Sequence, residues 1–128
     1  MKFHLTKAEN HQLITGFGAA QDGAFFVAIN DIQYRPPVII TTHQTITDHN
    51  IIDFETLTAD HFTDLLALHP EVVLLGTGDK HRFIQPKLSA VLTEKYIPVE
   101  CMTTAAACRT FNILVSEGRN VIAILLTH

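Results

Sequence analysis

The stretch 72–78, Val-Val-Leu-Leu-Gly-Thr-Gly, decides the fold of this sequence. Four consecutive apolar residues, without the alternation of a half-exposed strand, predict a strand buried on both faces in a parallel sheet. The two glycines end that run, and Pro86 then suits the first turn of a helix. A strand, a helix and a further strand in succession indicate an α/β fold with right-handed crossovers.

The residues after this helix repeat the same order of elements. Residues 97–101 are the next strand candidate, and Thr103 or Thr104 can cap a long helix. Gly118 occupies the position where a left-handed residue commonly ends a helix. Residues 121–126 are apolar and form the closing strand. We therefore expect the three strand candidates from residue 72 onward to share one sheet.

The region before residue 72 predicts further strands and one more helix. Asn30-Asp31 tolerates the positive φ angles of a tight hairpin turn, and Pro36-Pro37 requires a sheet edge or a corner. The polar stretch 42–50 is the segment whose structure the sequence decides least. Thr58 can cap a helix whose apolar residues form one face up to Leu68. The strand candidates of this region are 24–29, 32–34 and 38–41.

Composition limits the class of protein. The chain of 128 residues fits a single domain, 1–128, and 47% hydrophobic residues exclude intrinsic disorder. A net charge of −4 without any basic stripe argues against nucleic acid as a partner. No apolar stretch is long enough to insert into a membrane, and no signal peptide is evident. With only two cysteines, the sequence predicts a cytoplasmic location.

The turn Gly76-Thr77-Gly78 is the first candidate ligand site. Loops after buried strands are where open α/β sheets bind ligands, and the helix beginning near Thr103 adds unpaired N–H groups. Arg109 follows closely, so we expect turn, helix start and guanidinium to converge on one polar concavity that favours an anion. The alternative is structural: the glycines serve a sharp turn, and Arg109 pairs with a carboxylate such as Glu100 or Glu117.

Catalytic and metal-binding signals are weak. None of the eight histidines shows the tight spacing of a metal site, so the sequence predicts no bound metal and no cofactor. Cys108 lies early in a helix beside Arg109, where a thiolate can be activated, but free cysteines are most often buried. Ser89 and Ser116 fall within expected helices. No catalytic residue is assigned.

Three segments, 72–78, 100–114 and 117–125, resemble the Mth938-like family, also called DUF498. The resemblance implies a three-layer α/β fold: a central mixed five-stranded sheet, helices, and an added β-hairpin layer. It also implies relatives that assemble mitochondrial complex I, with no established enzymatic activity. Two departures are the absence of tryptophan before the first helix, and Tyr96 where the family often has glycine. The positions that match its recurring pattern are Gly76, Thr77, Gly78, Thr104, Arg109, Asn112, Gly118 and Arg119.

Two functional hypotheses follow. The first is a non-enzymatic binding or assembly-type protein that acts through a protein partner. The second is a small-molecule or anion-binding protein, or a cryptic enzyme, with a pocket at Gly76–Gly78, Thr104, Arg109, Asn112 and Arg119. A deep polar cavity favours the ligand hypothesis, whereas an exposed apolar patch favours a partner surface.

Overall fold

The computed structural model describes residues 11–127 and contains two β-sheets and three α-helices. A three-stranded antiparallel sheet has the order β1-β2-β3, and a mixed five-stranded sheet has the order β5-β4-β8-β6-β7. The strands are β1 (Ile14–Ala19), β2 (Phe25–Ile29), β3 (Ile32–Tyr34), β4 (Val38–Thr41), β5 (Thr45–Ile46), β6 (Val72–Thr77), β7 (Val99–Met102) and β8 (Val121–Leu126). The helices are α2 (Ala59–Thr63), the 3-10 helix η1 (Asp64–Leu68), α3 (Pro86–Thr93) and α4 (Thr104–Ser116).

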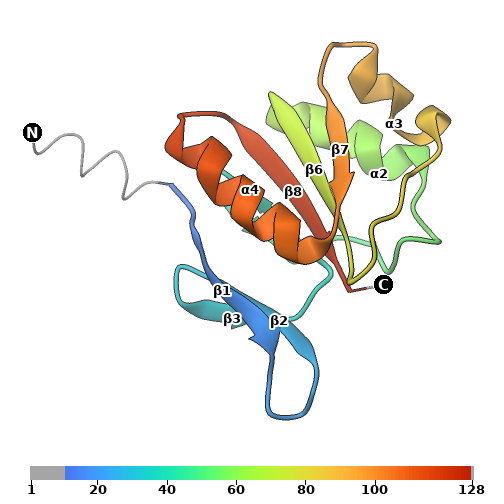
Figure 1. The fold of residues 1–128 in the computed structure, drawn as a ribbon. Coiled ribbons are helices and arrows are strands. Elements are labelled where there is room, and N and C mark those ends of the chain that lie inside the picture. The colour runs from blue at the N-terminus through green and yellow to red at the C-terminus, as the bar shows by residue number, and fades with distance from the viewer. Residues whose placement is uncertain (1–10, 128) are drawn as a thin grey trace, which may run out of the picture.

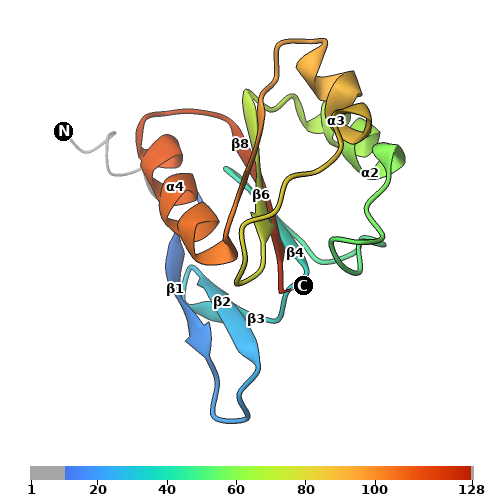
Figure 2. The same ribbon diagram turned by 45° about the vertical axis from the view of Figure 1, so that its right-hand side comes forward.

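The layers are those that the family resemblance implies. Strand β6 pairs in parallel with both β7 and β8, so the three strand candidates from residue 72 onward share one sheet. All six residues of β6 and of β8 are buried. Helix α4 and the three-stranded sheet cover one face of the five-stranded sheet, and α2, η1 and α3 cover the other (Figures 1 and 2).

The hairpin layer contains one strand more than the sequence predicts. The β2–β3 turn is confirmed, because Asn30 and Asp31 have φ values of 50° and 69°. Strand β1 was not expected, since Gly16 and Gly18 lower the β-propensity of its six residues. A contact distant in sequence holds it: the side chain of Asn112 on α4 bonds the backbone of Ile14 in both directions.

The strand expected at residues 97–101 begins two residues later, at Val99. Tyr96 has a φ of 62°, a left-handed conformation that bulky residues rarely adopt. The turn it makes lets the N–H of Ile97 donate to the carbonyl of Leu92, at 3.0 Å, and so delays the strand. The same φ angle gives a physical reason for a glycine at this position.

We predict that Tyr96→Gly stabilises the fold. The tyrosine side chain is 94% exposed, so its removal costs little packing, while the left-handed strain disappears. After the larger chain entropy of glycine is subtracted, the gain is about 1 kcal/mol in the free energy of unfolding, measured by urea denaturation. The control Glu94→Gly, at a right-handed position with φ −66°, should lose a similar amount. If Tyr96→Gly and Glu94→Gly changed the free energy of unfolding equally, Tyr96 would not be strained.

Candidate functional site

Helix and sheet approach closely where β6 meets the start of α4. A Cβ atom placed on Gly76 would lie 2.9 Å from both the Cα and the Oγ1 of Thr104, and 3.3 Å from the Cβ of Ala107. Backbone atoms occupy part of that space, so a larger residue would push α4 away from the sheet. Gly76 is therefore required for helix docking, whatever else the turn does.

Thr104 joins three elements at this point. Its hydroxyl accepts a hydrogen bond from the N–H of Gly78, at 2.9 Å, and donates one to the carbonyl of Leu126, at 2.6 Å. The backbone N–H of Thr104 donates to the carbonyl of Gly78, at 2.9 Å. Thr104 is only 2% exposed, so these bonds form away from water. They tie the ends of β6 and β8 to the first turn of α4.

Thr77 is also committed to the fold. Its hydroxyl lies within hydrogen-bonding distance of the carbonyls of Lys80 and Met102, at 2.5 and 3.1 Å, and accepts from the N–H of Arg82. These contacts connect β6 to the end of β7 and fix the loop 78–85. Since Thr77 is buried, its hydroxyl is not available to a ligand.

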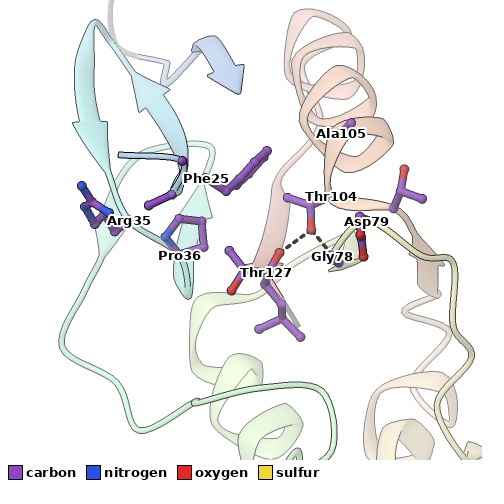
Figure 3. Close-up of a pocket in the computed structure, with 12 residues that line it drawn as sticks. Phe25, Arg35, Pro36, Gly78, Asp79, Thr104, Ala105 and Thr127 are labelled. Atoms are coloured by element: carbon purple, nitrogen blue, oxygen red, sulfur yellow. Dashed lines mark hydrogen bonds between the residues drawn. The ribbon is translucent and has the colours of Figure 1, made fainter. Parts of the chain in front are cut away.

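A cleft of about 650 Å³ opens beside this junction (Figure 3). One wall is the hairpin layer, and the other is the edge of the sheet formed by the carboxyl ends of its parallel strands. Of the residues expected at a ligand pocket, Gly78 and Thr104 line it, whereas the hairpin wall was not foreseen. The lining residues are Gly23, Ala24, Phe25, Arg35, Pro36, Gly78, Asp79, Thr103, Thr104, Ala105, Leu126 and Thr127.

Arg35 is the basic residue of this cleft, and it already has a partner. Its Nη2 lies 2.8 Å from Oδ2 of Asp22. The N–H of Ala24 donates to the same carboxylate, and this bond, together with Arg35, lowers the pKa of Asp22 below its usual value. Because both side chains are more than half exposed, the pair orients Arg35 without contributing much stability.

The structure separates the other expected pocket residues from the cleft. The guanidinium of Arg109 lies 5.1 Å from the ring centre of Phe17, and Asn112 bonds the backbone of Ile14. The Nε of Arg119 lies 3.8 Å from the carboxylate of Glu71, which precedes β6 at the amino end of that strand. The expectation that Arg109 and Arg119 converge with the Gly76–Gly78 turn is therefore wrong: both lie away from the cleft.

Helix geometry explains these positions. Arg109 follows Thr104 by five residues, about 140° further around the helix, so it faces the hairpin layer when Thr104 faces the sheet. It pairs with neither Glu100 nor Glu117 within residues 11–127. Arg119 comes after a helix of 13 residues, about 20 Å from its start. Which face of α4 meets which layer is a tertiary property that the local sequence does not contain.

Cys108 is not an activated nucleophile. The side chain is 1% exposed, and burial raises the pKa of its thiol to about 12, although Arg109 acts in the opposite direction. At neutral pH the thiol therefore stays protonated. Within residues 11–127, no three His, Cys, Asp or Glu side chains gather closely enough to hold a metal ion. The absence of a metal or cofactor stays a prediction.

The fold is that of a Mth938-like domain. A structure of a Bordetella pertussis protein described as a Mth938-like domain matches 91% of this chain and 85% of that one, with a TM-score of 0.74 and 23% identity. A crystal structure from Bordetella parapertussis matches with a TM-score of 0.80 and 27% identity, covering 91% and 95% of the two chains. The family model described as protein of unknown function (DUF498/DUF598) matches residues 17–126, and the chain belongs to this family.

Two curated relatives differ in what their names describe. The "13 kDa major membrane protein" of Francisella tularensis is 30% identical over 105 residues, which are 81% of this chain and 84% of the relative. The "NADH dehydrogenase [ubiquinone] 1 alpha subcomplex assembly factor 3" of Bos taurus is 35% identical over 78 residues, 59% of this chain. That match spans 42% of the bovine protein. Within the described residues, no helix has the length and apolar character to span a membrane.

We predict that Gly76→Ala destabilises the protein by about 3 kcal/mol, because the new methyl group forces α4 away from the sheet. Urea denaturation of the purified variant measures this loss. The matched control is Gly16→Ala in β1, where a Cβ would meet its nearest neighbour at an ordinary 3.9 Å. That variant should stay within about 1 kcal/mol of the unmodified protein. A Gly76→Ala variant as stable as the control would show that the close approach is not required.

Proposed function

We propose that this protein acts by binding a protein partner, in the manner of an assembly factor, without catalysing a reaction. The observation that carries the proposal is its similarity to the complex I assembly factors, 35% identity over 78 residues in the bovine protein. The matched share of that relative is less than half, so the partner and the complex served are part of the proposal. We place this activity in the cytoplasm.

The geometry supports this proposal through what the polar groups of the junction already do. The hydroxyls of Thr77 and Thr104 and the backbone of Gly78 bond other parts of the fold. The buried Cys108 thiol is protonated at neutral pH. The polar groups of Thr77, Gly78 and Thr104 are therefore engaged in structure, which favours a surface contact over catalysis at this turn.

A second candidate function is supported by the cleft. Its volume of about 650 Å³ falls in the range of small-molecule sites, roughly 300–1,000 Å³. Thr103 and Ala105 place the start of α4 on its wall, and Arg35 lies at the hairpin side. A small carboxylate or phosphate is the class of ligand that a helix start and an arginine favour. We rank it second because Arg35 is already paired with Asp22.

One experiment separates these functions. The full chain, immobilised, is incubated with native extract of its own source, and captured proteins are identified by mass spectrometry against an unrelated bait of equal size and charge. A captured protein is then purified and titrated against the free chain. We predict a 1:1 complex with a Kd near or below about 1 µM, the affinity expected of a specific partner. In parallel, melting temperatures are recorded with phosphate, sulfate and citrate against chloride of equal ionic strength.

The two arms have distinct outcomes. A purified partner that binds, with no anion-specific rise in melting temperature, supports the partner function. If no captured protein rebinds after purification while one anion raises the melting temperature, the partner function is wrong and the cleft ligand takes its place. If neither effect occurs, both functions are rejected.

A further inference from the structure

Strand β7 is an open edge of the five-stranded sheet. It is the last strand in the order β5-β4-β8-β6-β7 and pairs only with β6 among the described residues. In Figure 1 it lies at the front of the sheet, between α4 on one side and α3 on the other. The opposite edge strand, β5, has only two residues, so β7 is the longer of the two edges.

The register shows which backbone groups of β7 are free. The N–H of Val73 donates to the carbonyl of Pro98, at 2.9 Å, and Val73 is aligned with Val99. In a parallel ladder, alternate residues face the neighbouring strand, so Pro98, Glu100 and Met102 face β6. The N–H and C=O groups of Val99 and Cys101 therefore face outward, and no hydrogen bond joins them to another described residue.

Proline does not block this outer edge. An edge strand is often protected against further pairing by a proline whose missing N–H faces outward. Here the carbonyl of Pro98 faces β6, so its nitrogen faces β6 as well, and the outward side keeps both donors. The edge can therefore form hydrogen bonds with another strand.

The side chains of β7 differ between its two faces. Val99 and Cys101 are partly buried against the core on the α2 and α3 side, and Met102 packs on the α4 side. Glu100 is exposed, and no ion pair within residues 11–127 includes it. The edge thus combines apolar side chains on one face with one unpaired carboxylate on the other.

We propose that β7 accepts an extended segment of a partner protein as a sixth strand of the sheet. The backbone of that segment bonds Val99 and Cys101. Its apolar side chains cover those two residues on the α3 side, and a Lys or Arg beside Glu100 pairs with the carboxylate. This inference rests on the proposed partner-binding function and specifies the chemistry of the segment: alternating apolar and basic residues.

A second copy of this chain does not fit the edge well. When the β7 strands of two copies pair antiparallel, the register that engages both outward residues of each copy aligns Val99 with Cys101 of the other copy. That register places the two Glu100 carboxylates directly opposite each other, which is unfavourable. Charge complementarity therefore favours a different, basic segment.

Hydrogen exchange tests the open edge in the full chain. We predict that the amides of Val99 and Cys101 exchange rapidly, while those of Glu100 and Met102, which bond β6, are protected at least about tenfold more strongly. The measurement uses NMR on the isotope-labelled protein. Equal protection of all four amides would show that another part of the chain covers β7, and the proposal would be wrong.

Binding is tested with a capped heptapeptide of alternating valine and lysine. Two further versions carry N-methyl groups on every valine or on every lysine. A strand uses the N–H groups of alternate residues toward one neighbour, so one methylated peptide should bind like the parent and the other at least about tenfold more weakly. Glu100→Lys should weaken the parent peptide by about tenfold, and Glu117→Lys, at the far end of α4, should not.

The outcomes separate this proposal from the proposed function. If the peptide does not bind, or if both methylated versions bind equally, strand addition is rejected. If a partner captured from extract binds the Glu100→Lys variant as tightly as the unmodified chain, the edge is not its site, while the partner-binding function stands. If no partner is captured but the peptide binds with the predicted pattern, the partner function fails and the edge keeps only its affinity for basic strands.

Discussion

The contact between Gly76 and Thr104 is the constraint on which the rest of the structure depends. The absence of a side chain at Gly76 lets the first turn of α4 approach to a distance that a Cβ atom would fill. At that distance the Thr104 hydroxyl reaches both Gly78 and Leu126, the ends of two neighbouring parallel strands. A buried hydroxyl with a donor and an acceptor satisfied is stable, and the same groups left unpaired would be costly.

The docked helix also positions the hairpin layer against the five-stranded sheet. Because α4 is held against β6 and β8, Arg109 and Asn112 meet the hairpin layer, through Phe17 and Ile14. The hairpin layer then closes one wall of the cleft. The hydroxyls of Thr77 and Thr104 are in this way part of the framework, while the outward backbone groups of β7 and the Glu100 carboxylate bond no other described residue.

The sequence predicted what depends on local chemistry and on a resemblance. The apolar run at Val72, the Asn30-Asp31 turn and the three-layer architecture are confirmed. Strand β1 was missed because its glycines lower its β-propensity. The side chain that stabilises it, Asn112, lies 98 residues away in the sequence. The faces of α4 and the hairpin wall of the cleft, with Arg35, were missed for the same reason. They depend on how distant elements pack. Which backbone groups of β7 face outward likewise follows only from the register of β7 with β6.

The replacement of Thr104 by valine tests this account most directly, because valine keeps the shape of threonine and removes only the hydroxyl. The change leaves the N–H of Gly78 and the carbonyl of Leu126 buried without a partner. We predict a loss of about 2–4 kcal/mol in the free energy of unfolding, measured by urea denaturation. Thr104→Ser, which keeps the hydroxyl and loses one methyl group, should cost about 1 kcal/mol. A valine variant within about 0.5 kcal/mol of the unmodified protein would contradict the central role of this contact.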